Sequence, residues 1–242
     1  MVFEDGTVDR TWRGPPEYKF LTTPVPPHQE FIDGVLTRDV IIDPIRGTRV
    51  RIYIPETDKT KLALMVHFHA CDDAYSALLW LQNLARGESA QPWLQTHADF
   101  ERIFLIGDST GGNLVHQVAA RAGKDGLEPV RLAGGIMLHP GLPEGSNKDH
   151  PITCPMGAAA PPLTEEGLPA MLLVVAEMDL LKDSELDYHE AMKKAGKEIE
   201  LLINQGMEHS FYLNKIAVDN DQVTAARFEQ LISEIINFMN RH

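Results

Sequence analysis

The sequence predicts an α/β protein in which helices cover both faces of a mostly parallel sheet. Continuous apolar runs alternate with segments of helical periodicity after residue 60, and this alternation is typical of a parallel sheet with crossover helices. Several runs carry almost no polar residue, as expected of strands buried on both faces. The expected strands are 62–68, 103–106, 132–138, 171–176 and 199–203.

The first part of the chain is expected to differ from this pattern. Residues 1–32 are rich in proline, which prevents regular helix or central strand, so they are interpreted as an irregular arm. The runs 35–42 and 50–54 are rich in β-formers and are joined through turn residues. They predict an antiparallel hairpin at an edge of the sheet.

Four helices are expected after this hairpin. The first is opened by Asp72 and Asp73 and carries apolar residues to position 84, and the second follows residue 109. The third runs from about 184 to 195, and the last starts near Asp221 with an apolar face for the sheet. No internal repeat interrupts this order, so residues 1–242 are interpreted as one domain.

Composition excludes several classes of partner. The formal net charge of −13 would repel nucleic acid and anionic membranes. No apolar run approaches the roughly 18 residues of a membrane span. Cys71 and Cys154 do not form a disulfide framework, and we expect both to be free thiols in a reducing compartment. The expectation is a cytoplasmic protein, with the nucleus left open.

The motif Gly107-Asp108-Ser109-Thr110-Gly111 provides the candidate nucleophile. It lies between an expected strand and an expected helix, which is the context that a G-x-S-x-G nucleophile turn requires. The small flanking residues allow a sharp turn that exposes the Ser109 hydroxyl. The alternative is an ordinary glycine-containing strand-to-helix turn. We predict that Ser109 is the nucleophile and that the backbone N–H of Thr110 lies at the oxyanion.

A serine nucleophile needs a histidine base and a carboxylate that orients this base. Asp179 directly follows an expected strand, where a carboxylate is held rigidly, whereas Asp183 is interpreted as a cap of the next helix. His209 lies in a glycine-containing loop after the last expected strand, and His139 is its nearest competitor. The predicted triad is Ser109, Asp179 and His209, which needs no cofactor and no metal.

The motifs at residues 107–113, 179–183 and 209–212 resemble those of plant carboxylesterases, in the hormone-sensitive-lipase-like group of α/β hydrolases. Segments 4–10 and 145–151 are similar to the same plant group. The resemblance implies the α/β-hydrolase fold and a serine esterase that acts on small esters or lactones. Within the group the chain looks most like the carboxylesterases implicated in strigolactone breakdown. A monomer and a homodimer both remain open.

Two departures from the family pattern flank the predicted site. The family has a His-Gly-Gly-Gly loop, a helix and a further strand where His69 here continues directly into Ala70. It also has a helical cap after the His-Pro-Gly that corresponds to residues 139–141, where Leu142 follows directly here. A strand region and the cap are therefore expected to be missing. His69 remains as a candidate oxyanion or substrate-binding residue, and each lost oxyanion donor typically costs about 10²- to 10³-fold in rate.

Two related functions stay open as alternatives. The resemblance extends to gibberellin receptors, which bind a hormone without turning it over and have lost the catalytic histidine. It also extends to isoflavonoid dehydratases, which use a related pocket for elimination. Because His209 is present, the sequence favours the enzyme over the receptor, whereas the triad alone does not separate an esterase from a dehydratase.

Overall fold

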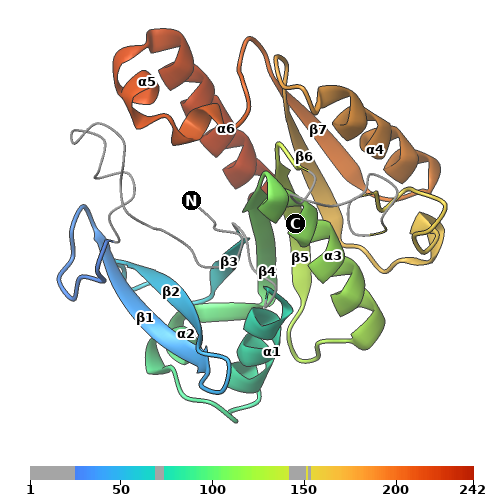
Figure 1. Cartoon of the computed structure of the whole chain (residues 1–242). Helices are drawn as coiled ribbons and strands as arrows, with labels where there is room; N and C mark the ends of the chain where they lie inside the picture. The colour runs from blue at the N-terminus through green and yellow to red at the C-terminus, as the bar shows by residue number, and fades with distance from the viewer. Residues whose placement is uncertain (1–24, 69–73, 142–150, 152–153) are drawn as a thin grey trace, which may run out of the picture. The chain divides into compact units, whose positions relative to one another are not determined.

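The computed structural model describes residues 25–68, 74–141, 151 and 154–242. The chain divides into two compact units, Met1–Thr57 and Asp58–His242. The described strands form two separate sheets, one of two strands and one of five strands (Figure 1). His69, Cys71, residues 1–24 of the arm, and both junctions with a missing family segment lie outside the described residues.

The first unit is built around an antiparallel hairpin of β1 (Val35–Asp43) and β2 (Thr48–Pro55). Its turn is fixed by the Asp43 carboxylate, which accepts the backbone N–H groups of Ile45 and Arg46. The predicted hairpin is therefore confirmed, but its predicted place at an edge of the main sheet is wrong. The two strands pair only with each other among the described strands.

The second unit contains a five-stranded, wholly parallel sheet in the order β3-β4-β5-β6-β7, which confirms the predicted α/β architecture. The strands are β3 (Leu62–Phe68), β4 (Ala98–Asp108), β5 (Leu132–Leu138), β6 (Ala170–Ala176) and β7 (Ile199–Asn204). β4 begins well before the expected residue 103, because strand pairing with β3 starts at Ala98 in the polar part of the segment.

β3 departs from the prediction of a strand buried on both faces. It lies at the end of the sheet, where its one partner among the described strands is β4. Met65 is 48% exposed, and the side chain of His67 is 56% exposed. An edge strand has neighbours on one side only, so an apolar composition alone did not guarantee its burial.

The helices are α1 (Ala74–Ala85), α2 (Pro92–His97), α3 (Thr110–Asp125), α4 (Lys182–Lys194), α5 (Lys215–Asn220) and α6 (Gln222–Arg241). The four predicted helices are confirmed as α1, α3, α4 and α6. The sequence did not predict α2 and α5, which are too short to show a clear helical period. Among the described residues, no helix combines the length and apolar character needed to cross a membrane.

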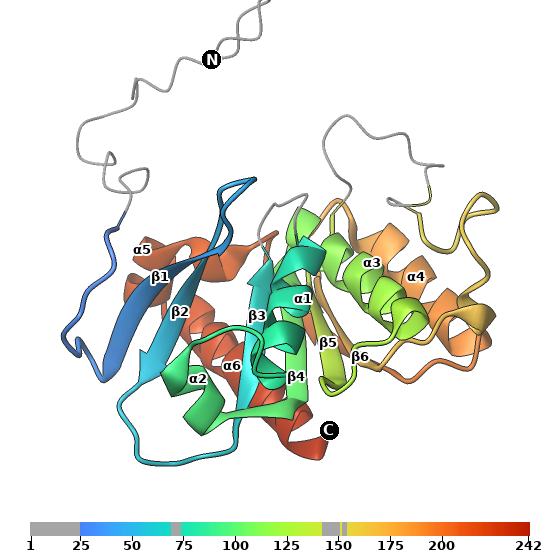
Figure 2. The ribbon, with the colours of Figure 1, turned by 90° about the horizontal axis from the view of Figure 1, so that it is seen from below.

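The sheet of the second unit separates two helical layers (Figure 2). A side chain at Gly134 would meet Phe238 of α6, whereas one at Gly135 would meet Val115 of α3, so these helices cover opposite faces. Tyr188 of α4 reaches His116 of α3, which places α4 beside α3. The core on the α6 side is closed by Leu231, Ile235 and Phe238 against β4, β5 and β6.

Candidate active site

The carboxyl ends of the central strands lie in register, and this alignment brings the predicted site residues together. Asp108 of β4 is opposite Leu138 of β5, and Leu138 is opposite Val174 of β6. Parallel strands end at the same edge of a sheet, where α/β proteins form their binding sites. The chain therefore places Ser109, His139, Asp179 and His209 in the loops at this edge.

Ser109 occupies a strained turn between β4 and α3. Its φ of 52° and ψ of −121° are unusual for a residue with a side chain. A Cβ at Gly107 would lie 2.1 Å from the backbone oxygen of Gly111, so the turn closes only around glycine. Backbone bonds fix the turn further, because Ser109 N–H donates to Leu138 O and Gly141 N–H donates to Ser109 O, both at 2.9 Å.

Asp179 is held between the loops that follow β6 and β7. The backbone N–H of Met178 donates to the oxygen of Met207 at 3.0 Å, and the Glu177 carboxylate accepts the N–H of Gly206 at 2.8 Å. One oxygen of Asp179 accepts the N–H of Leu181 at 3.0 Å. Its carboxylate is 4% exposed, so its orientation is fixed by protein contacts more than by water.

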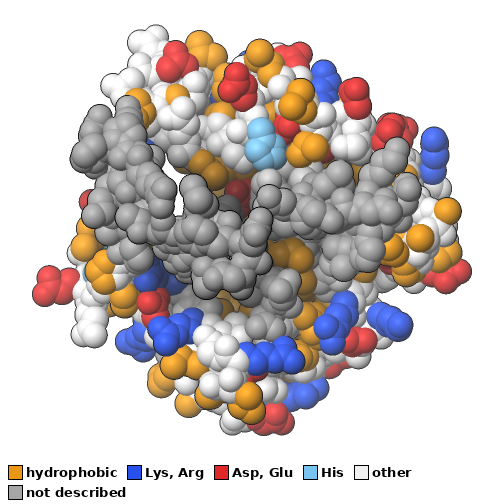
Figure 3. Space-filling view, viewed as in Figure 1, with side chains coloured by type: hydrophobic (Ala, Val, Ile, Leu, Met, Phe, Trp, Pro, Cys, Tyr) orange, Lys and Arg blue, Asp and Glu red, His pale blue; other side chains and the backbone are white. Residues whose placement is uncertain are grey.

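His209 links Asp179 to Ser109. Its Nδ1 forms a hydrogen bond with Asp179 Oδ2, and its Nε2 lies 3.0 Å from Ser109 Oγ. An ionised carboxylate can only accept, so Nδ1 carries the proton and Nε2 faces the serine hydroxyl as an acceptor. The His209 side chain is 35% exposed, and Figure 3 shows that a histidine reaches the surface on the face drawn there. A substrate can approach such a base from solvent.

Asp183 and His139 are the alternative candidates for the acid and the base, and their environments differ from those of Asp179 and His209. Asp183 is exposed within the first turn of α4, after the N-cap residue Leu181, so its predicted role as the cap is wrong by position. His139 is fully buried beside the site, and its ring centroid lies 5.8 Å from that of His209. Neither residue has a hydrogen bond to Ser109 among the bonds of the described residues.

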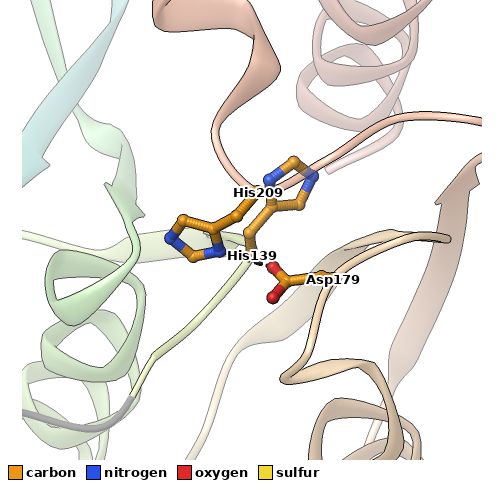
Figure 4. A group of neighbouring side chains, drawn as sticks. All are labelled: His139, Asp179 and His209. Atoms are coloured by element: carbon orange, nitrogen blue, oxygen red, sulfur yellow. Dashed lines mark hydrogen bonds and ion pairs between the residues drawn. The ribbon is translucent and has the colours of Figure 1, made fainter.

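Two imidazoles and a carboxylate also have the composition of a metal site. One ligand atom from each of His139, Asp179 and His209 lies within 4.8 Å of the others (Figure 4). However, Asp179 and His209 are hydrogen-bonded to each other, and Nδ1 of His139 accepts the N–H of Ser210. A metal ion would have to break these bonds, so the donors fit an acid–base pair better than a metal site.

Of the two residues predicted to bind the oxyanion, Thr110 lies within the described part of the chain and His69 does not. Thr110 is the first residue of α3, where a backbone N–H has no acceptor within the helix and where the helix dipole favours negative charge. This position suits the predicted role of Thr110. The other predicted oxyanion residue, His69, lies outside the described residues and stays a prediction.

A cavity of about 140 Å³ adjoins Ser109 between α3 and α4. Gly141 lines it, and a Cβ there would lie 3.2 Å from Ser109 Oγ. Glu185 also lines it, is 2% exposed, and has no hydrogen-bond partner for its carboxyl oxygens within the described part of the chain. Sequence reasoning missed this residue, although the spacing to Tyr188 and Met192 places it on the buried face of the helix.

Burial also perturbs the pKa values of two histidines and one glutamate near the site. Burial lowers the pKa of His116 and of His139 to about 4. Burial, with the nearby charge of Asp179 as a smaller cause, raises the pKa of Glu185 to about 8. At neutral pH both histidines are therefore neutral, and Glu185 is mostly protonated.

These shifts predict a maximum of stability near pH 6.5. Between pH 6.5 and about 4 the unfolded histidines bind protons that the folded ones do not, so the free energy of unfolding falls as pH falls. Between pH 4.5 and about 8 unfolded Glu185 is ionised while the folded carboxyl keeps its proton, so stability falls as pH rises. Each pKa unit is worth about 1.4 kcal/mol. Below pH 6.5 the two histidines outweigh Glu185, and above pH 6.5 Glu185 outweighs the two histidines.

Urea unfolding across this pH range checks the expectation. Glu185→Gln removes the ionisable group, so it should flatten the alkaline limb and steepen the acid limb between pH 4.5 and 6.5, where Glu185 opposes the two histidines. An alkaline limb that persists in Glu185→Gln would show that another group causes it.

Comparison with known proteins identifies the family. A family model described as the alpha/beta hydrolase fold matches residues 62–154 and 141–213, which together span more than half of the chain. The chain belongs to this α/β-hydrolase family. The match consists of two pieces that overlap at 141–154, where the sequence predicts that the family's cap is missing.

Several curated relatives of this chain are plant proteins. It is 26% identical to a 2-hydroxyisoflavanone dehydratase of Glycyrrhiza echinata over 98% of the chain and 93% of the relative. It is 26% identical to tuliposide A-converting enzyme 1, chloroplastic, of Tulipa gesneriana over 96% of the chain and 75% of the relative. It is 32% identical to a gibberellin receptor of Arabidopsis thaliana over 71% of the chain and 54% of the receptor. The dehydratase alignment spans 323 positions against 242 residues in the chain, so the relative has segments that this hydrolase lacks.

Solved structures show the same fold at lower identity. Vibralactone cyclase superposes with a TM-score of 0.68 at 17% identity, over 98% of this chain and 93% of that one. A bacterial heroin esterase superposes with a TM-score of 0.66 at 19% identity, over 86% of this chain and 84% of that one. These matches confirm the predicted α/β-hydrolase fold.

Proposed function

We propose that this protein is a serine carboxylesterase that hydrolyses small carboxylic esters or lactones through an acyl-enzyme. The observation that carries the proposal is the chain of contacts from Asp179 through His209 to Ser109 Oγ, in which Nε2 lies 3.0 Å from the hydroxyl. This distance is within the range for direct proton transfer from a serine to its base.

The reaction follows from the orientation of these groups. Nε2 of His209 takes the Ser109 proton while Oγ attacks the carbonyl carbon, and the carbonyl oxygen becomes an oxyanion. The N–H of Thr110 donates to this oxygen. The imidazolium, stabilised by Asp179, then protonates the leaving alkoxide, and the acyl group stays on Ser109. Water repeats the sequence and releases the acid, so the cycle needs no cofactor.

The dehydratase remains a second candidate because a relative with that name aligns with 98% of the chain. The receptor alternative rests on a match that covers 54% of the receptor. Formation of a covalent acyl-enzyme belongs to the esterase alone among the three functions. This difference makes the acyl-enzyme the quantity to measure.

The test is a stopped-flow burst experiment with p-nitrophenyl acetate. We expect one equivalent of p-nitrophenolate per active site before steady turnover, and an acetylated Ser109 in the peptide mass spectrum of the quenched protein. The mass measurement detects the adduct even where missing oxyanion donors make turnover slow. Absence of both the burst and the adduct at saturating ester would contradict the esterase.

A finer proposal is that the protein hydrolyses a plant hormone such as strigolactone. We also propose that it does so in the cytoplasm. The similarity of segments 4–10 and 145–151 to the plant carboxylesterase group supports it. Mass spectrometry of products from a strigolactone analogue tests the substrate, since unchanged analogue after complete p-nitrophenyl acetate hydrolysis would exclude it. A fluorescent fusion tests the compartment.

A further inference from the structure

His139 directly follows β5 and lies next to the triad, but it has no hydrogen bond to the Ser109 hydroxyl among the bonds of the described residues. Its backbone N–H donates to Val174 O at 2.9 Å, so the residue still belongs to the ladder between β5 and β6. Its side chain is fully buried, and its φ is 43°. A residue with a side chain reaches this left-handed region only at a cost, so surrounding contacts must hold it.

The hydrogen bonds of His139 define its tautomer. Its Nδ1 accepts the backbone N–H of Ser210 at 2.9 Å, and its Nε2 lies 3.4 Å from Asn204 Oδ1. A backbone N–H can only donate, so Nδ1 is unprotonated and the ring proton lies on Nε2, facing the amide oxygen. Because burial lowers its pKa to about 4, His139 keeps this acceptor at neutral pH.

The acceptor acts on the residue that follows the catalytic base. Ser210 adopts φ 53° and ψ 33°, the left-handed helical region that serine rarely enters. It is also the N-cap of the short turn Phe211–Leu213. Two rings of this turn pack on the His139 ring, with centroids 6.0 Å away for Phe211 and 5.4 Å away for Tyr212. The direction in which the chain leaves His209 is therefore set by contacts with His139.

We propose that His139 is a positioning residue for His209: its neutral Nδ1 holds the left-handed backbone of Ser210, and this aims the His209 ring between Asp179 and Ser109. The expected change in kcat rests on the proposed function. The expected change in the orientation of the His209 ring rests on the geometry alone. His139 transfers no proton in this role. What it supplies is one hydrogen-bond acceptor at a fixed place.

Two substitutions test the hydrogen-bond acceptor of His139 separately from the rest of its imidazole ring. In His139→Asn, Oδ1 is the same number of bonds from Cα as Nδ1 of histidine, so it can accept the Ser210 N–H. In His139→Leu the volume is filled and the acceptor is lost. We expect kcat for p-nitrophenyl acetate to fall at least tenfold in His139→Leu and to stay within about threefold of the parent in His139→Asn, with KM little changed, because misplacing a catalytic group acts on the chemical step.

The low-field proton NMR resonance of the His209 Nδ1–H, shared with Asp179, gives a readout that does not need activity. It should be sharp in the parent and in His139→Asn, and broadened or lost in His139→Leu. His97→Leu, on α2 outside the site, controls for the removal of an imidazole and should leave the resonance and kcat unchanged. Melting temperatures show that each variant is folded.

Several outcomes would overturn the inference. Equal activity and an equal resonance in all variants would show that the Ser210 bond does not aim His209. Equal loss in His139→Asn and His139→Leu would mean that the imidazole itself is required. A lower melting temperature with an unchanged resonance would reduce His139 to a stabilising role. If the parent hydrolyses no ester, the proposed function fails, while the resonance still decides whether His139 positions His209.

Discussion

Ser109→Ala is expected to remove ester hydrolysis almost completely, by a factor on the order of 10⁵ to 10⁶ in kcat, while the protein stays folded. Without Oγ no acyl-enzyme forms, and the remaining triad residues have no nucleophile to activate, which is why loss of a nucleophile costs nearly as much as loss of a whole triad. Steady-state hydrolysis of p-nitrophenyl acetate and the acetyl adduct in the mass spectrum both measure this loss.

Stability should respond differently from activity at this position. The φ of 52° is unfavourable for serine and for alanine alike, so Ser109→Ala should change the free energy of unfolding by less than about 1 kcal/mol. Ser109→Gly relieves the backbone strain and should stabilise the protein by about 1 kcal/mol while being equally inactive. Urea unfolding distinguishes the two variants. Hydrolysis that survives in both would remove Ser109 from the mechanism.

The features that the sequence predicted well are those with strong local constraints. The strand, the glycine turn and the helix around Ser109 lie in one continuous segment. A Cβ at Gly107 would lie 2.1 Å from the backbone oxygen of Gly111, which shows why the motif needs glycine. The register of the parallel strands then explains how Asp179 and His209, distant in sequence, reach the same edge. Because Ser109, Asp179 and His209 each stand at or after the end of a predicted parallel strand, the sequence was enough to predict that they meet.

The features that the sequence did not predict depend on contacts between distant segments. The apolar run of β3 looks like a buried strand, and only its place at the end of the sheet makes it half exposed. The proposed role of His139 depends on a bond to a residue 71 positions away, and the raised pKa of Glu185 depends on its burial beside a cavity. The sequence carries no sign of the His139 bond, and for Glu185 only the helical spacing to Tyr188 and Met192 indicates a buried position.

Asp179→Asn is expected to lower kcat by about 10⁴ with little change in KM. Asparagine keeps the shape of the side chain, but its amide can donate to Nδ1, which would leave the proton on Nε2 and remove the acceptor that faces Ser109. The negative charge that stabilises the imidazolium is also lost. Because asparagine carries no carboxylate at any pH, raising the pH should not restore the activity of Asp179→Asn. The pH dependence of kcat/KM measures this.

Asp183→Asn is the matched control for this prediction, because it makes the same change of side chain four residues later. Asp183 is exposed in the first turn of α4, where its charge interacts with the helix dipole and is worth about 0.3–1 kcal/mol of stability. Its kcat should stay within about twofold of the parent, because it has no bond to His209 among the described contacts. Large loss of activity in Asp183→Asn with a harmless Asp179→Asn would transfer the role of the acid to Asp183. Comparable losses in both would mean that the orientation of α4, more than a single carboxylate, fixes the base.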